Sequence, residues 1–384
     1  MAENRVSAII LEGGASKTTI EEDMTAVRKA VVLDNIEKMR ETPGIDQVIL
    51  GTNYADLAAQ AETLGAVVDF SLEPFHFGRR VLRIVGERGL TSVLYMGGAA
   101  APLIRREDLA WMAKHLREEE GIAILNNPQS PDMVGFTPAS AITLIPPPQS
   151  DNELGYALTD LAGLRRVMVP NSPWVSFDLD TPTDLAILSL QRTAGRRTTR
   201  ALSELSFRPD LERLAKALGR VESMFSVIGS EIALIGRVGP PIWAFLNMNV
   251  KVRFRVFSEE RGMKALGRQD RGEVVSLVGH FIDREGPEPF FAYLGTICQA
   301  ALFDSRVLFA HWKKQVSDWD RFQSDLGRFD LIQDPEVREF ARAAQAAAIP
   351  IILGGHALVS GGLWLLAEDS LAVQGLEANR LMQF

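Results

Sequence analysis

The chain has 384 residues but only one cysteine, Cys298, so an intramolecular disulfide is excluded. It also lacks the CxxC or Cys/His spacing of a structural zinc site, and a buried thiol is the simpler interpretation. Positive charge is scarce as well, because 41 Lys and Arg face 49 Asp and Glu and leave a formal net charge of −8. This balance argues against a nucleic-acid binder held by a global positive field.

Long apolar segments are equally few. The start, MAENRVSAII, carries charges where a signal peptide would be apolar, and we expect a cytoplasmic protein. Residues 346–367 are apolar over a length that could span a bilayer. Pro350 and four glycines divide this run, which favours a buried strand-like and helix-like pair over a membrane segment. Peripheral membrane attachment is the alternative that rests on apolarity alone.

The first half alternates between short apolar runs and longer helical patterns. The expected strands are residues 6–11, 46–51, 66–70, 91–97, 121–126 and 165–170, and the expected helices are 21–41, 54–64, 77–88 and 105–119. Strands that alternate with helices at short spacing predict a parallel sheet covered on both faces. We therefore expect a three-layer, Rossmann-like α/β domain over residues 1–195.

The second half has a different pattern, and we expect a mainly α-helical domain over residues 205–384. Helical periodicity is evident over residues 209–224, 291–313 and 335–348, and an alternating stretch over 250–257 predicts a strand. Residues 351–366 suggest a strand, a glycine turn and the start of a helix. A chain of this length is consistent with two domains.

A glycine pair follows the first expected strand, in the stretch LEGGASKTT. Gly13 and Gly14 would let the backbone approach phosphates closely, and Lys17 and Lys29 could balance the charge of a triphosphate. Neither a P-loop nor a GxGxxG pattern is present, and a tight turn explains the glycines equally well.

Two carboxylates stand out in the stretch SFDLDTPTDLAIL. Asp178 and Asp180 alternate with apolar residues, so both carboxylates point to one side of a strand end and make an oxygen site suited to Mg²⁺. Thr181, Pro182 and Asp184 form a helix-start signature that structure alone explains. That signature does not explain Asp178 and Asp180.

Over residues 5–190 the chain resembles the MobA-like nucleotidyltransferases. Three motifs carry the resemblance: LEGG after the first strand, DLDTPTDL before a late helix, and a Pro-Leu turn after the fourth strand. The resemblance implies transfer of a nucleoside monophosphate from an NTP to a small-molecule acceptor, with release of pyrophosphate. It places Gly13 and Gly14 on the nucleotide, and Asp180 together with Asp178 on Mg²⁺.

Two departures from the family pattern concern the metal and the phosphates. The family's metal-binding Asp corresponds to Ala100, and no acidic residue occurs between Thr91 and Arg106. An acidic run, Glu21 to Asp23, lies near where phosphates would bind, where like charges repel. The chain is therefore either an enzyme with a rearranged metal site, or a catalytically degenerate scaffold or nucleotide sensor whose function lies in the second half or in an oligomer interface.

The second half holds further candidates of unassigned chemistry. Asp304, Arg306 and His311 lie within two expected helical turns, and His356 follows a glycine pair. Histidine suits acid–base chemistry near neutral pH. We expect an NTP and a small-molecule acceptor as partners if the chain is active, with no nucleic acid, and a homo-oligomer is left open.

Overall fold

The computed structural model describes residues 4–375 and forms two compact units. Within these residues, the first unit comprises 4–16, 25–176 and 195–201, and the second comprises 17–24, 177–194 and 202–375. The expected division lay between residues 195 and 205. The stretch with Asp178 and Asp180 instead belongs to the second unit, so the units interleave along the chain.

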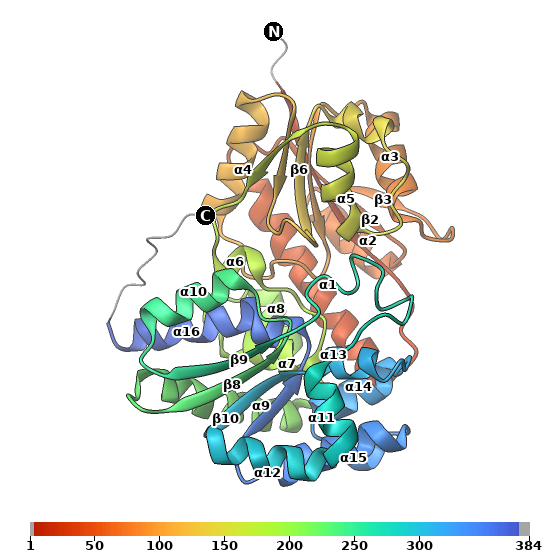
Figure 1. Ribbon diagram of the computed structural model, residues 1–384. Helices are drawn as coiled ribbons and strands as arrows, with labels where there is room; N and C mark the ends of the chain where they lie inside the picture. The colour runs from red at the N-terminus through yellow and green to blue at the C-terminus, as the bar shows by residue number, and fades with distance from the viewer. Residues whose placement is uncertain (1–3, 376–384) are drawn as a thin grey trace. The chain divides into compact units, whose positions relative to one another are not determined.

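The first unit is built on a seven-stranded mixed sheet of order β3-β2-β1-β4-β6-β5-β7 (Figure 1). Its strands are β1 (Val6–Glu12), β2 (Gln47–Thr52), β3 (Val67–Phe70), β4 (Ser92–Gly97), β5 (Ile122–Leu125), β6 (Met133–Thr137) and β7 (Arg165–Met168). All pairings are parallel except those of β6, which runs antiparallel to both β4 and β5. The expected strands form, and β6 is the one that the sequence reading missed.

Helices cover both faces of this sheet. They are α1 (Thr19–Arg40), α2 (Ala55–Thr63), α3 (Phe77–Arg88), α4 (Arg106–Glu118), α5 (Asp151–Tyr156), α6 (Pro173–Ser176) and α8 (Arg196–Ser203), with a 3₁₀ turn η1 (Ala139–Leu144) and a π turn η2 (Ala157–Leu161). One core contains side chains of α1, α2 and α4, and the other contains side chains of α3, η1 and α5. The three-layer α/β class expected for the first half is confirmed.

The second unit contains a four-stranded, fully parallel sheet of order β11-β10-β8-β9. Its strands are β8 (Glu231–Gly236), β9 (Arg253–Ser258), β10 (Ala300–Asp304) and β11 (Ile351–Gly354). The strands expected over 250–257 and at 351 form as β9 and β11. The continuous helix expected over 291–313 is wrong, because β10 interrupts it: the run Ala-Ala-Leu-Phe-Asp is fully buried in the middle of the sheet.

Helices nevertheless make up most of this unit. They are α7 (Pro182–Leu190), α9 (Arg208–Ser223), α10 (Pro240–Asn249), α11 (Leu277–Glu285), α12 (Pro287–Ile297), α13 (Ser305–His311), α14 (Asp318–Asp325), α15 (Pro335–Ala346) and α16 (Gly361–Val373), with short turns η3 (Met224–Ser226), η4 (Phe329–Leu331) and η5 (His356–Val359). Side chains of α11, α12, α13 and α15 pack on one face of the sheet. Contacts among α7, α9, α10 and α16 build the other layer.

The apolar run at 346–367 forms β11, η5 and most of α16, in agreement with the core pair expected there. Within residues 4–375, no helix has the length and apolar character needed to cross a membrane.

Candidate functional site

The stretch that leads into α7 places two carboxylates opposite a buried face. Phe177 and Leu179 are 1% and 0% exposed, whereas Asp178 is half-buried and Asp180 is exposed. The alternation expected from the sequence is therefore present. Asp178 forms an isolated β-bridge rather than the end of a longer strand.

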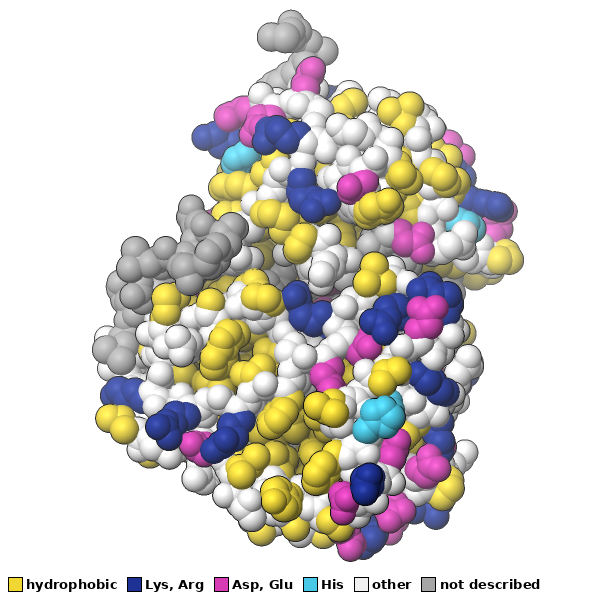
Figure 2. All heavy atoms as spheres, in the orientation of Figure 1, with side chains coloured by type: hydrophobic (Ala, Val, Ile, Leu, Met, Phe, Trp, Pro, Cys, Tyr) yellow, Lys and Arg dark blue, Asp and Glu magenta, His cyan; other side chains and the backbone are white. Residues whose placement is uncertain are grey.

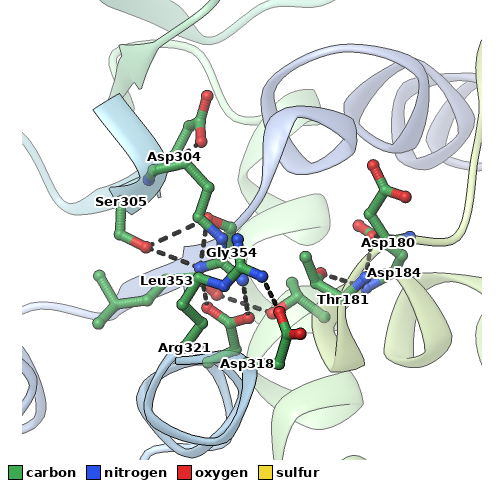
Figure 3. Close-up of polar contacts among 12 residues, drawn as sticks. Asp180, Thr181, Asp184, Asp304, Ser305, Asp318, Arg321, Leu353 and Gly354 are labelled. Carbon is green, nitrogen blue, oxygen red and sulfur yellow. Dashed lines mark hydrogen bonds and ion pairs between the residues drawn. The ribbon is translucent and has the colours of Figure 1, made fainter. Parts of the chain in front are cut away.

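Thr181 and Asp184 begin α7 with a capping box, as the sequence indicated. The Thr181 hydroxyl accepts a hydrogen bond from the Asp184 amide, and Asp184 Oδ2 accepts from the amides of Thr181 (2.7 Å) and Asp180 (3.0 Å). Two donors on one oxygen fix the position of this carboxyl group. Figure 3 shows Asp180 and Asp184 close together at this helix start.

The other oxygen of Asp184 is unusual. Asp184 is 0% exposed, and its Oδ1 has no hydrogen-bond partner in the described structure. Burial, reinforced by the neighbouring Asp180 carboxylate, raises the pKa of Asp184 from 3.8 to about 8. A buried acid with an unused oxygen next to an exposed carboxylate provides the hard-oxygen donors that a divalent cation prefers.

The central strands of the second sheet meet this region at their carboxyl ends. β8 has β9, the next strand along the chain, on one side and β10 on its other side. The direction of the chain connections reverses between β8 and β10, which makes this a topological switch point. Gly236 ends β8 with φ +117°, and a Cβ there would lie 2.5 Å from the Asp304 Cβ. Glycine is therefore required for β8 and β10 to end side by side.

Asp304 ends β10 in a buried ion pair with Arg237, the residue after β8. Arg237 Nε lies 2.6 Å from Asp304 Oδ2, and its terminal nitrogen lies 3.1 Å from Oδ1. Burial alone would raise the pKa of Asp304, but the charge and hydrogen bonds of Arg237 outweigh it and hold the pKa below its usual value. The two-point geometry makes this pair a rigid corner of the site.

A second buried pair lies beside the first. Arg306 binds both oxygens of Asp325 on α14, at 2.8 and 2.6 Å, and also donates to the Ser305 hydroxyl at 2.9 Å. Arg321 on the same helix is ion-paired with Asp318, yet its buried Nε has no hydrogen-bond partner in the described structure (Figure 3). Burial and the nearby Arg306 charge lower the pKa of Arg321.

His356 lies in η5, directly after β11 and its glycine pair. Burial, followed by repulsion from Arg237, lowers its pKa from 6.5 to about 4, although Asp304 and Asp180 act in the opposite direction. The imidazole is therefore neutral at pH 7 and can accept or donate a hydrogen bond without carrying charge.

The structure thus gathers several sequence candidates from distant parts of the chain. Asp180, Asp304, Arg306 and His356 all belong to this carboxyl edge of the second sheet. Sequence reasoning missed Arg237, and it assigned Asp184 only a capping role. The GRVGPP turn after β8 was the available signal for Arg237, but it is informative only once β8 is recognised as a strand.

The remaining nucleotide candidates are placed differently. Gly13 and Gly14 follow β1 in the first unit, where the Gly14 amide donates to Asn53 Oδ1 at 3.0 Å. Lys29, also in the first unit, pairs with Asp56 at 2.8 Å. Lys17 lies in the second unit, where its backbone amide donates to Glu21. The Gly14 amide and the Lys29 ammonium are therefore already engaged.

Ala100, where the resemblance to the MobA-like enzymes implies a metal-binding Asp, is a packed position. Ala100 is 3% exposed and closes a turn with Gly97. Nearby, Glu12 at the end of β1 is buried and lies 3.2 Å from Arg28, and burial raises its pKa. A Cβ on Gly98 would lie 2.1 Å from Glu12 Oε2, so the Glu12 side chain fills the space above that glycine.

His311 has surroundings of its own at the end of α13. It is 9% exposed, and its Nε2 lies 3.0 Å from Asp283 Oδ2 on α11. It shares α13 with Arg306 but contacts a different layer, where a pocket opens between α11 and α15.

No protein-family model and no curated protein matches this chain. Solved structures resemble parts of it. A cytidylyltransferase from Leptospira borgpetersenii is 16% identical, covers 54% of this chain and 96% of its own, and has a TM-score of 0.40. Rv0371c from Mycobacterium tuberculosis is 17% identical, with 50% and 100% covered and a TM-score of 0.36.

Glucosyl-3-phosphoglycerate synthase from Mycobacterium tuberculosis, solved with Mn²⁺, UDP and its product, is 13% identical. That likeness covers 43% of this chain and 70% of the synthase, with a TM-score of 0.34. At these scores the likenesses decide neither the reaction nor the substrate of this chain.

Proposed function

We propose that the protein is a nucleotidyltransferase that transfers a nucleoside monophosphate from an NTP to a phosphorylated or cofactor-like acceptor and releases pyrophosphate. The observation that carries this proposal is the pairing of exposed Asp180 with buried Asp184 at an edge that also holds Arg237 and Arg321. Carboxylates beside arginines provide ligands for a cation and for the phosphates that the cation bridges.

Mg²⁺ fits this donor set. The unpartnered Oδ1 of Asp184 and the exposed carboxylate of Asp180 are hard oxygen donors, and Asp178 adds a third two residues earlier. A bound cation would also relieve the repulsion between Asp180 and Asp184. Mg²⁺ held there would neutralise charge on the leaving pyrophosphate. In the same unit Arg237 and Arg321 are paired with Asp304 and Asp318, and the buried Nε of Arg321 is a donor without a partner in the described structure.

In the first unit we propose Gly13 and Gly14 as nucleotide contacts, since they directly follow β1 at the carboxyl edge of its sheet. We also propose that Lys17 in the second unit and Lys29 in the first balance negative charge of the phosphates. For Lys29 this requires exchange of Asp56 for a phosphate. That ion pair is partly exposed, so its disruption costs about 1 kcal/mol or less.

A second function is favoured by the first unit itself. Groups of the protein itself fill the carboxyl edge of the first sheet. The Gly14 amide is hydrogen-bonded, Lys29 is ion-paired, Ala100 is buried, and the Glu12 side chain lies over Gly98. On this reading the first unit is a scaffold or nucleotide sensor, and the chemistry belongs to the carboxyl edge of the second sheet.

Calorimetric titration of GTP, CTP and ATP, each with and without Mg²⁺, tests the proposal. The variants are Asp180→Ala and, as a matched control in the same unit, Asp330→Ala at an exposed position of η4. Mg²⁺-dependent binding that is lost in Asp180→Ala and kept in Asp330→Ala is expected. Binding that does not depend on Mg²⁺ and is kept in Asp180→Ala favours the sensor. If no nucleotide binds, both the transferase and the sensor are refuted and the scaffold is favoured.

A further inference from the structure

A pocket of about 650 Å³ opens in the second unit, between α11, the start of α12, the end of α13 and α15. Its walls combine aromatic and aliphatic side chains with carboxylates, among them Asp283, Trp312, Glu336, Glu339 and Phe340. Figure 2 shows acidic, basic and apolar side chains side by side on the surface over α11 and α15. None of these residues belongs to the edge where Asp180 and Asp304 lie.

The carboxylate of Asp283 is held in place at the pocket wall. Its Oδ2 lies 3.0 Å from His311 Nε2, and its Oδ1 accepts a hydrogen bond of 2.7 Å from the Trp312 indole. Within residues 4–375, no lysine or arginine forms an ion pair with Asp283. The negative charge is therefore oriented by side chains that do not neutralise it.

The state of His311 follows from its second nitrogen. The backbone amide of Ser276 donates to His311 Nδ1 at 3.1 Å, so Nδ1 is an acceptor and the proton of the neutral ring lies on Nε2. This assignment rests on the hydrogen-bond network. Gly279 leaves room for the ring, since a Cβ there would lie 2.3 Å from His311 Cδ2. His311 is thus a neutral donor to Asp283.

This tautomer argues against a metal site. Ligand atoms of His280, Asp283 and His311 lie within 4.8 Å of one another, which suits a cation by distance. A metal at His311 Nε2, however, needs the lone pair that the proton occupies. Ligating histidines normally donate from their other nitrogen, whereas here the other nitrogen accepts.

The net charge of the pocket remains negative. Lys314 is the one lysine or arginine of the lining, and it pairs with Asp334 at 2.9 Å and with Glu336 at 2.7 Å. Its charge is therefore already balanced. Asp283 and the exposed Glu339 add two further negative charges. A ligand that complements this pocket carries positive charge.

We propose that this pocket binds a small organic cation, a protonated amine carried on an apolar body. The ammonium group would lie against Asp283, and the body would contact the partly exposed indole of Trp312 and the ring of Pro287. Aromatic faces add cation–π attraction for such a group. The inference does not rest on the proposed nucleotide chemistry.

Phenethylammonium and phenylacetate, which share a body but differ in charge, are the probes. Binding is followed through indole fluorescence, with Trp312→Phe to identify the reporting tryptophan. We expect phenethylammonium to bind and phenylacetate not to. Asp283→Asn should weaken ammonium binding about fivefold, as the loss of a half-exposed ion pair implies, while Asp330→Asn should leave it unchanged.

Glu339→Gln provides a second test if Asp283→Asn loosens α11, because Glu339 is exposed and its removal should weaken binding about twofold. Equal binding of both probes, or ammonium binding unchanged in both pocket variants, overturns the proposal. So does stoichiometric binding of Zn²⁺ that depends on Asp283 and His311 while phenethylammonium does not bind, since the pocket would then be a metal site.

Discussion

Asp184 should make the stability of the protein fall as the pH rises above neutral. Its pKa is 3.8 in an unfolded chain and about 8 in the folded one, so the folded state holds a proton that the unfolded state has lost. Stability from this group is complete below pH 3.8 and is lost as the pH rises through 8. Linkage gives a loss of about 1 kcal/mol between pH 7 and pH 8.

Replacement of Asp184 by Asn mimics the protonated carboxyl group and removes its titration. The amide oxygen of Asn can still accept from the Thr181 and Asp180 amides, so α7 keeps its cap. We therefore expect Asp184→Asn to lack about 1 kcal/mol of the decline between pH 7 and pH 8. The assay is urea unfolding at pH 7.0, 7.5 and 8.0 in the presence of EDTA.

Two other groups with shifted pKa values are present in both the wild type and Asp184→Asn. Burial, reinforced by Asp369, raises the pKa of Glu222 to about 7, so its contribution is also lost with rising pH. His356, with a pKa of about 4 in the folded state, acts oppositely: its contribution is lost as the pH falls from 6.5 toward 4. The difference between wild type and variant isolates Asp184, and equal slopes in the two proteins would refute the assignment.

Three other perturbations have defined outcomes. Mg²⁺ at millimolar concentration should flatten the same pH dependence in wild type but not in Asp184→Asn, and identical slopes with and without Mg²⁺ would contradict a cation site there. Arg306→Met should destabilise by about 3–5 kcal/mol in urea unfolding because it leaves the buried Asp325 carboxylate unpaired, and Arg306→Met with Asp325→Leu should recover part of the loss. Gly98→Ala should destabilise by about 1–3 kcal/mol because its Cβ meets Glu12, and Glu12→Ala should relieve much of that cost if the clash is the cause.

The first unit was largely predictable because its strands and helices have distinct periods. The run VSAIIL and the amphipathic stretch 77–88 each fit one template. β6 was missed since it returns antiparallel, without a helix before it. β8 and β10 were missed because IALIG and AALFD are short apolar runs buried on both faces, which periodicity alone does not separate from a buried helix.

The candidate site was predictable only in part, for a related reason. Asp178 and Asp180 were accessible because alternation is a local property. The pairs Arg237–Asp304 and Arg306–Asp325 join positions 67 and 19 residues apart, and only the folded sheet brings them together. The raised pKa of Asp184 likewise arises from burial, which depends on the packing of the whole second unit.

The interleaving of the two units constrains how the protein can be divided and made. The chain passes between them five times, at residues 16/17, 24/25, 176/177, 194/195 and 201/202. A fragment of residues 205–384 would lack α7, whose Thr183 hydroxyl donates to the carbonyl of Leu353 on β11. During synthesis α7 emerges long before β11, so it must wait for its partner strand. No single cut therefore yields two self-sufficient halves. Every segment of the first unit precedes residue 202, whereas the second unit needs residues 17–24 and 177–194 in addition to the segment that begins at residue 202.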